Sequence, residues 1–393
     1  MPGSIIASGA RTPIGKLNGA LASLAAADLG GAAIKAALER AGVAPEQVDY
    51  VLMGQVLLAG AGQIPARQAA VKAGIPMTVP ATTVNKVCPS GLHSIYLADL
   101  MIQAGDAEII VAGGQESMTQ APYLLPGARA GYRAGDQKVV DSMMFDGLTD
   151  AFDHDAMGLS TEHYNEKGPQ IGRDRQDAFA ALSHERAAAA AKAGRLAEEI
   201  VPVSIPSRKG DIVVESDEGI RPETTVETLG ALKPAFTPNG TITAGNASQI
   251  SDGGAAVVVM SASAASRLGV TPLGEIVGYG QVAGPDNSLL TQPSRAILAA
   301  TGRAGVGVAD LSVIEINEAF AAVALASIDD LSLDEERVNP NGGAIALGHP
   351  VGMSGTRIAL ALLLELRRRG GGVGAASLCG GGGQGDALLL RSL

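Results

Sequence analysis

The amino-acid sequence predicts an α/β protein with a duplicated βαβ core and an inserted loop domain. Three observations lead to this prediction. Runs rich in valine and isoleucine alternate with alanine-rich stretches of helical period. Similar strand–turn–helix patterns occur in both halves of the chain, and a segment rich in glycine, proline and charge separates them. The 393 residues, 46% of them hydrophobic, suffice for a large core.

The first half alternates between expected helices and expected strands. Residues 29–42 (LGGAAIKAALERAG) have the apolar spacing of a helix that ends at Gly42. Residues 50–58 (YVLMGQVLL) form an apolar run typical of a buried strand. A strand-to-helix pattern spans residues 84–105 (VNKVCPSGLHSIYLADLMIQAG), and a further strand is expected within 107–117 (AEIIVAGGQES).

The second half repeats this order of elements. Its strand lies within residues 311–320 (LSVIEINEAF), and its strand-to-helix pattern spans 338–366 (VNPNGGAIALGHPVGMSGTRIALALLLEL). The final strand falls within 372–385 (GVGAASLCGGGGQG). A duplicated unit explains this repetition most simply.

The spacing of corresponding positions in the two halves also agrees. Gln55 precedes Cys88 by 33 residues, and Asn317 precedes His349 by 32. If the halves share a fold, their strand-to-helix turns meet across a pseudo-twofold axis. We therefore expect Cys88, Asn317, His349 and Cys379 in one crevice beyond the strand ends, where ligands bind in open α/β sheets.

The segment between the halves interrupts the pattern. Residues 119–244 contain much glycine, proline and charge, with one clear helix at 175–194 (RQDAFAALSHERAAAAAKAG). We expect an inserted loop domain here, and such loops often contact ligands. The expected N-terminal half comprises residues 1–118 and 245–268, and the C-terminal half comprises residues 269–393.

Composition excludes several classes of function. The net charge of −11 and the 3% of aromatic residues argue against nucleic acid as a partner, because phosphate binding needs clustered basic residues and stacking aromatics. No uninterrupted apolar stretch is long enough to span a membrane, and the N-terminus lacks a signal-peptide pattern. Only two cysteines occur, which suits a reducing compartment, so we expect a cytoplasmic protein.

Cys88 is a candidate nucleophile, although a lone cysteine is more often a small buried hydrophobe. It lies where a strand leads into a helix, and Pro89 is expected in the first helical turn. A helix dipole contributes only ~0.3–1 kcal/mol, less than the ~1.4 kcal/mol of one pKa unit, so the thiol needs a base. His349, between glycine and proline on an expected turn, offers that base.

The second thiol, Cys379, follows a strand and precedes a run of glycines. Glycines let a backbone approach a ligand closely and leave N–H groups free to stabilise an oxyanion. Two thiols and one imidazole suit a reaction in which one sulfur holds an acyl group and the other transfers a proton.

Gly380, Gly382 and Gly385 also match G-x-G-x-x-G, the pattern of a dinucleotide-binding loop. Such a loop must be followed by a helix, but residues 386–393 have the pattern of a strand, so a dinucleotide site is rejected.

The other histidines do not suggest a metal centre. Their spacing lacks any ligand pattern, so no metal is expected; they are His93, His154, His163 and His184.

Six motifs together resemble the thiolases, most closely the biosynthetic, short-chain acetyl-CoA acetyltransferases. They are NKVCPSG, NEAFAAVA, GGAIALGHPVGMSG, CGGGGQG, ARTPIGK and TITAGNASQISDGGAA. The resemblance runs from about Ile5 to Leu390 with the motifs in the expected order. It implies a thiolase-like fold of two mixed sheets, with helices between and outside them.

The resemblance also implies a ping-pong Claisen condensation. Cys88 takes an acetyl group from one acetyl-CoA, and Cys379 deprotonates the methyl group of a second, which gives acetoacetyl-CoA and CoA. The reverse reaction is thiolysis. His349 activates Cys88 and donates to a thioester oxygen, and Asn317 orients a water in that first oxyanion hole. The backbone N–H groups of Cys88 and Gly381 form the second hole.

Contacts to coenzyme A follow from the same resemblance, with CoA as substrate and product and no further cofactor. The matching positions are Leu148, Met157, Arg221, Thr228, Ala244, Ser248, Leu289, Ala319 and Phe320. Arg221 suits an adenine ring or phosphate in an acidic protein. Many biosynthetic members have histidine where this chain has Ala156, and no role passes to the nearby His154.

The family further implies a homotetramer, a dimer of dimers, and a place in fatty acid metabolism.

The main alternative to an acetyl-CoA acetyltransferase is a broader-range 3-ketoacyl-CoA thiolase of fatty acid degradation. A decarboxylating ketosynthase is a rival, opposed by Asn317 in place of histidine and by the second thiol. A non-catalytic acyl-CoA binding protein is another, opposed by the presence of Cys88, His349 and Cys379 together.

Overall fold

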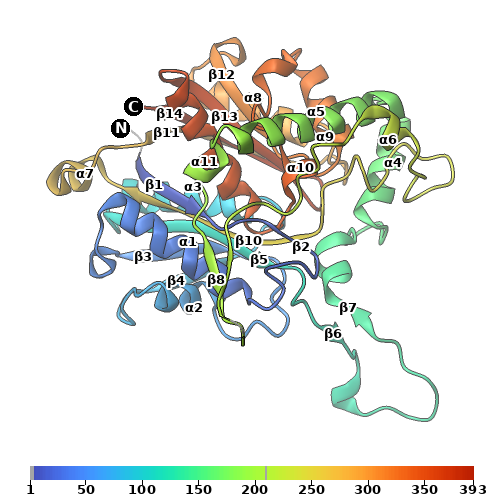
Figure 1. The fold of residues 1–393 in the computed structure, drawn as a ribbon, viewed down its shortest axis with the longest axis horizontal. Helices are drawn as coiled ribbons and strands as arrows, with labels where there is room; N and C mark the ends of the chain where they lie inside the picture. Colours follow the sequence, from blue (N-terminus) through green and yellow to red (C-terminus); the bar gives the residue numbers. More distant parts are fainter. Residues whose placement is uncertain (1–3, 209) are drawn as a thin grey trace.

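The computed structural model describes residues 4–208 and 210–393, which form one central ten-stranded sheet flanked by helices (Figure 1). Hydrogen-bonded neighbours follow the order β12-β13-β14-β11-β1-β10-β5-β3-β4, and β2 pairs with β10. The strands are β1 (Ile5–Arg11), β2 (Gly15–Lys16), β3 (Tyr50–Gly54), β4 (Ala81–Val84), β5 (Ile109–Ser117), β10 (Ser251–Met260), β11 (Gly274–Ala283), β12 (Leu311–Ile316), β13 (Gly372–Gly380) and β14 (Gln384–Ser392).

The predicted α/β class and the duplication are confirmed. The order β1-α1-β3-α2-β4-α3-β5-β10 in the first half corresponds to β11-α8-β12-α9-α11-β13-β14 in the second. A parallel bridge between Ile314 and Val338 occupies the place of β4 in the second half. The helices are α1 (Ala26–Ala41), α2 (Pro65–Lys72), α3 (Ser90–Ala104), α8 (Gln292–Ala304), α9 (Ala321–Asp330), α10 (Ala344–Leu347) and α11 (Ser354–Arg368).

The mixed sheets of the two halves meet edge to edge. Ile5 and Ile6 of β1 pair with Glu275 and Gly274 of β11, so the sheets are continuous at this junction. Helices α3 and α11 pack against each other between the half-sheets, while α1 and α2 cover one outer face and α8 and α9 the other. This is the predicted arrangement of helices between and outside the sheets.

Local signals explain where the elements begin and end. Helix α1 ends at Gly42, whose φ of 65° is left-handed and therefore favours glycine, as predicted. Strands of the sheet core are buried on both faces, and β5 and β10 accordingly consist almost wholly of buried residues. The expected strand at residues 50–58 is shorter than predicted, since β3 ends at Gly54.

The segment between β5 and β10 contains more helix than its apolar spacing indicates. The predicted helix is present as α5 (Arg173–Lys192), together with α4 (Met157–Lys167) and α6 (Val226–Gly230). Helix α4 has no apolar stripe because it buries polar side chains that form hydrogen bonds. Glu162, for example, accepts from the backbone N–H of Ile242 at 2.6 Å.

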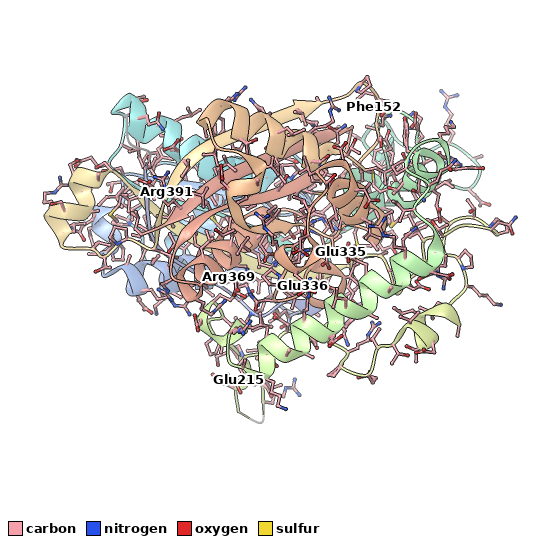
Figure 2. All side chains as sticks on the ribbon, turned by 90° about the horizontal axis from the view of Figure 1, so that it is seen from above. Phe152, Glu215, Glu335, Glu336, Arg369 and Arg391 are labelled. Carbon is pink, nitrogen blue, oxygen red and sulfur yellow. The ribbon has the colours of Figure 1, made fainter. Side chains whose placement is uncertain are left out.

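Two parts of this segment differ in how they lie relative to the two halves that form the central sheet. Helix α5 lies along the C-terminal half, held by ion pairs such as Arg175–Asp329 at 2.6 Å and Arg186–Glu336 at 3.2 Å (Figures 1 and 2). The strands β6 (Tyr123–Leu124) and β7 (Val140–Asp141) instead form an arm that projects away from the body (Figure 1). The predicted domain boundaries remain predictions.

A membrane-spanning helix is not found in the described ranges 4–208 and 210–393, where no helix combines sufficient length with sufficient apolar character.

Candidate active site

Cys88 lies on a tight turn between β4 and α3. The preceding residue, Val87, has a φ of 52°, which is rare for a β-branched side chain and indicates local strain. Asn85 Oδ1 accepts from the N–H of Val87 at 3.1 Å, and Ser90 Oγ accepts from the N–H of Lys86 at 2.8 Å. These short-range bonds hold the turn that presents the cysteine.

The start of α3 differs from the prediction by one position. The helix begins at Ser90, and Pro89 occupies the N-cap rather than the first helical turn. Cys88 therefore lies just outside the helix.

The environment of Cys88 favours its neutral form. Burial raises the pKa of the Cys88 thiol to about 12, and the nearby Glu116 carboxylate acts in the same direction. The backbone N–H groups of Cys88 itself and Gly381 oppose this shift by donating to the sulfur. At neutral pH the resting protein therefore contains a thiol at this position, whose proton must leave during any nucleophilic attack.

His349 is held in one tautomer by its neighbours. Its Nδ1 lies 2.6 Å from Oγ of Ser354, and that hydroxyl donates to the carbonyl oxygen of Pro350 at 2.9 Å. Because a hydroxyl has one proton, the imidazole Nδ1 is the donor in the first bond, and Nε2 is unprotonated and able to accept a proton. Burial, with the charge of Arg357, lowers the pKa of His349 to about 3, so the ring is a neutral base.

Asn317 directs its side chain toward this imidazole. It follows β12, and its N–H donates to the carbonyl oxygen of Ser377 at 2.9 Å. Its Nδ2 lies 3.4 Å from Nε2 of His349, which fits an amide donor facing an imidazole lone pair. Its Oδ1 is buried and has no hydrogen-bond partner among the residues that the structure describes.

Cys379 lies near the end of β13, opposite Gly385 on β14. The residue is fully buried. Burial, followed by the neighbouring Cys88 sulfur, raises the pKa of the Cys379 thiol well above its ordinary value. The two thiols are close in space, because Cys88 and Cys379 line the same small cavity.

The glycine hairpin after Cys379 packs directly against the Cys88 turn. A Cβ atom added at Gly380 would lie 2.7 Å from Cδ of Pro89, and one added at Gly381 would lie 3.3 Å from Cγ1 of Val87. Glycine at Gly380 therefore permits the close approach of the two segments that hold the thiols.

These groups meet at one cavity of about 60 Å³. Cys88, His349, Cys379 and Gly381 all line it, and Asn317 contacts His349. The predicted meeting of Cys88, Asn317, His349 and Cys379 is therefore present in the structure, and Gly381 lies with them. The remaining lining is mostly apolar and consists of Val87, Gly147, Leu148, Met157, Ser248, Leu289, Ala319, Phe320 and Val351.

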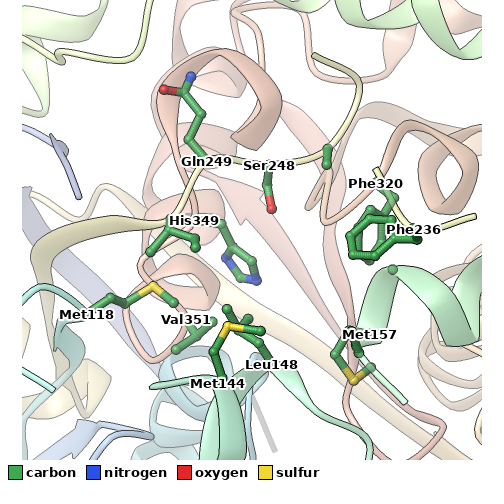
Figure 3. Close-up of a pocket in the computed structure, with 14 residues that line it drawn as sticks. Met118, Met144, Leu148, Met157, Phe236, Ser248, Gln249, Phe320, His349 and Val351 are labelled. Atoms are coloured by element: carbon green, nitrogen blue, oxygen red, sulfur yellow. The ribbon is translucent and has the colours of Figure 1, made fainter. Parts of the chain in front are cut away.

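A second cavity of about 250 Å³ leads to the same imidazole. Figure 3 shows His349 between Ser248 and Leu148, with Phe320 and Phe236 on the adjoining wall. Six of the nine residues expected to contact coenzyme A line the smaller cavity, and four of these also line the larger one; the six are Leu148, Met157, Ser248, Leu289, Ala319 and Phe320. Ala156 also lines the larger cavity.

The other three expected contacts lie elsewhere. Arg221, Thr228 and Ala244 are exposed and do not line either cavity. Thr228 caps its own helix by accepting from the N–H of Thr225 at 3.0 Å. The backbone N–H of Arg221 donates to Nδ1 of His184 at 3.2 Å. Their contact with a nucleotide remains a prediction.

Two buried side chains in this region were not predicted. One is Ser354, which sets the tautomer of His349. The other is Glu116, which accepts from the N–H groups of Val56 at 2.9 Å and Gly352 at 3.0 Å and whose pKa is raised to about 7 by burial. The sequence did contain a signal for Glu116, namely a charged residue near the end of a mostly apolar strand. A carboxylate that is buried there needs hydrogen-bond donors around it.

The neutral resting state has a measurable consequence for pH dependence. Because burial raises the pKa of Cys88, the thiolate form grows only as the pH rises far above neutrality. We expect the ultraviolet spectrum of the wild-type protein, minus that of Cys88→Ser, to show no thiolate absorbance at neutral pH and to gain it only in alkaline solution. A thiolate signal that persists to acidic pH would instead indicate a cysteine–histidine ion pair.

Comparison with known proteins finds similar sequences and a similar structure over nearly the whole chain. Residues 4–263 match the family model "Thiolase, N-terminal domain", and residues 270–392 match "Thiolase, C-terminal domain". The chain is 59% identical over 388 residues to a probable acetyl-CoA acetyltransferase of Mycolicibacterium smegmatis, covering 98% of this chain and 100% of the relative. It is 54% identical over 389 residues to the acetyl-CoA acetyltransferase of Cupriavidus necator, covering 98% of each chain. The crystal structure of the Bacillus anthracis acetyl-CoA acetyltransferase superposes with a TM-score of 0.97 at 39% identity, covering 100% of this chain and 99% of that one.

Proposed function

Because this chain belongs to the thiolase family of acyltransferases, we propose that it is an acetyl-CoA C-acetyltransferase. In this proposal two molecules of acetyl-CoA condense to acetoacetyl-CoA and CoA through an acetyl-cysteine intermediate, and the reverse reaction is thiolysis. The observation that supports it most is the meeting of two thiols and one neutral imidazole at a single small cavity. The names of the similar enzymes support the choice of acetyl-CoA as substrate.

In the first half-reaction the sulfur of Cys88 attacks the thioester carbonyl of acetyl-CoA. Nε2 of His349, which is unprotonated, takes the thiol proton as the new C–S bond forms. The N–H groups of Cys88 and Gly381 converge near that sulfur and can hold the carbonyl oxygen as it becomes negative. The CoA sulfur then leaves and takes the proton of Cys379.

In the second half-reaction the Cys379 thiolate removes a proton from the methyl group of another acetyl-CoA. The carbanion attacks the acetyl carbon, a C–C bond forms, and the bond to Cys88 breaks. Protonated His349 donates to the enolate oxygen, together with a water that Asn317 would hold through its unpaired, buried Oδ1. The imidazole finally returns its proton to Cys88, so both thiols end neutral, as their raised pKa values favour.

The test is an assay with acetyl-CoA as the sole acyl donor. We expect acetoacetyl-CoA and CoA to form in equal amounts, with an acetyl group detectable on Cys88 by mass spectrometry. A decarboxylating ketosynthase would require a malonyl thioester, and a non-catalytic binder would give no acetylated species. Either result would refute the proposal.

A broader-range 3-ketoacyl-CoA thiolase is the second candidate. The reacting groups face a cavity of only about 60 Å³, which suits a short acyl group. A neighbouring cavity of about 550 Å³ shares Val87, Gly147, Met157 and Gly381 with it and could receive a longer chain. Comparing thiolysis of acetoacetyl-CoA with that of a longer 3-ketoacyl-CoA distinguishes a short-chain enzyme from one of fatty acid degradation.

We further propose how coenzyme A binds, how the chains assemble and where the protein is located. The six cavity-lining residues would hold the pantetheine end of coenzyme A, and Arg221, Thr228 and Ala244 its nucleotide end, with no separate cofactor. A homotetramer is supported by the projecting arm, where Tyr123, Leu125 and Val139 are 69%, 53% and 50% exposed. Sedimentation of the full chain measures this state. The free cysteines support a cytoplasmic location.

A further inference from the structure

A fully buried carboxylate close to the site takes no part in the proposed chemistry. Asp386 lies on β14, and its oxygens accept from Nζ of Lys86 at 2.8 and 3.1 Å. The same carboxylate accepts from the hydroxyl of Tyr279 and lies 3.5 Å from Nδ1 of His93. Nζ of Lys86 also donates to Oε1 of Gln281 at 3.0 Å. Such a network is costly to bury unless its members satisfy one another.

The Lys86–Asp386 pair joins the two segments that hold the thiols. Lys86 precedes Cys88 by two residues, whereas Asp386 follows Gly385, which pairs with Cys379 across the hairpin. The paired residues are 300 positions apart in the sequence. Near the cavity itself, these two segments also meet through the hydrogen bond from the N–H of Gly381 to the Cys88 sulfur and through close contacts between the glycines and the Cys88 turn.

The turn that Lys86 anchors is a strained one. Val87, between Lys86 and Cys88, has a left-handed φ of 52°. Residues in such conformations persist only when the surrounding structure holds them in place. The hydrogen bonds that the side chains of Asn85 and Ser90 accept hold the turn internally, but they do not fix its position relative to β13 and β14. The ion pair between Lys86 and Asp386 contributes directly to that position.

We propose that Lys86 and Asp386 form a positioning pair that sets the separation between Cys88 and Cys379. The inference rests on the proposed two-thiol reaction. Acetylation of Cys88 depends mainly on His349 and the nearby N–H groups, whereas condensation also needs the acetyl carbon on Cys88 to lie within reach of the carbanion that Cys379 generates. The pair therefore acts chiefly on condensation.

The experiment compares the two half-reactions in Asp386→Asn, Lys86→Met and the double variant. Mass spectrometry follows the acetylation of Cys88 during a single turnover. Condensation is measured as the steady-state rate of acetoacetyl-CoA formation, divided by the fraction of protein molecules that can become acetylated. We expect acetylation near the wild-type rate and condensation slowed about 10²-fold, the loss that a displacement of about 1 Å produces. The double variant should lose no more than either single variant, because the pair acts as a unit.

Glu275→Gln serves as the matched control. Glu275 on β11 pairs with Arg391 on β14, the strand that also holds Asp386. Figure 2 shows Arg391 well apart from Phe152, which lines a cavity together with Gly381. This variant should condense normally.

The outcomes separate the two proposals. Unchanged condensation in Asp386→Asn and Lys86→Met, or an equal loss in both half-reactions, overturns the positioning role while leaving the proposed function intact. A wild-type protein that neither becomes acetylated nor condenses acetyl-CoA overturns the proposed function, and this inference with it.

Discussion

Replacing Cys88 with alanine abolishes acetyl transfer, because the cavity then lacks the sulfur that His349 activates. The backbone donors of residue 88 and Gly381 and the base remain, but the sulfur that accepts the acetyl group in the proposed mechanism is missing. We expect condensation and thiolysis to fall by roughly 10⁴–10⁶-fold, as when the nucleophile of a covalent mechanism is removed. Steady-state rates and intact-mass spectra after incubation with acetyl-CoA measure both effects.

The control for this variant is binding. The apolar walls formed by Leu148, Met157 and Phe320 do not depend on the Cys88 thiol, so Cys88→Ala should bind CoA about as well as the wild-type protein. Calorimetric titration with CoA checks this. An acetyl adduct that forms at the normal rate on Cys88→Ala, for instance on Cys379, would show that the nucleophile has been misidentified.

Replacing Cys379 with alanine separates the two half-reactions. Cys88 should still become acetylated, more slowly, because CoA can leave as a thiolate without the proton of Cys379. Condensation should fall by roughly 10²–10⁴-fold or more, since no other group is placed to remove the methyl proton. Rapid quenching followed by mass spectrometry detects the accumulated acetyl-enzyme, and a coupled assay follows acetoacetyl-CoA.

Cys379→Ser distinguishes proton transfer from packing. Serine retains most of the shape of cysteine but is a far weaker acid, so it should fail in condensation as alanine does. If Cys379→Ser condenses at nearly the wild-type rate, the thiol is not the base. If both variants lose acetylation and condensation equally, the residue acts through packing.

The neutral thiols and imidazole give these two predictions a common basis. Burial raises the pKa of both cysteines and lowers that of His349. Each proton transfer therefore occurs within the catalytic cycle rather than in the resting protein. Desolvation causes these shifts of pKa, and the spacing of residues in the sequence does not indicate it.

Much of the fold could be predicted because its signals are local. The helix that ends at Gly42 and the strand after the glycine run at 380–383 follow from short-range spacing and turn chemistry. The duplication was visible because both halves repeat one order of elements. Helix α4 was not predicted, since hydrogen bonds rather than an apolar stripe stabilise its buried face.

The α/β class, the repeated half and the identity of the reactive side chains could be inferred from the amino-acid sequence, because these depend on residue type and on patterns along the chain. The tautomer of His349, the neutral state of the thiols and the pairing of Lys86 with Asp386 became visible in the folded protein alone. These properties depend on which distant groups exclude water or donate hydrogen bonds. Such contacts join residues up to 300 positions apart, and no local pattern encodes them.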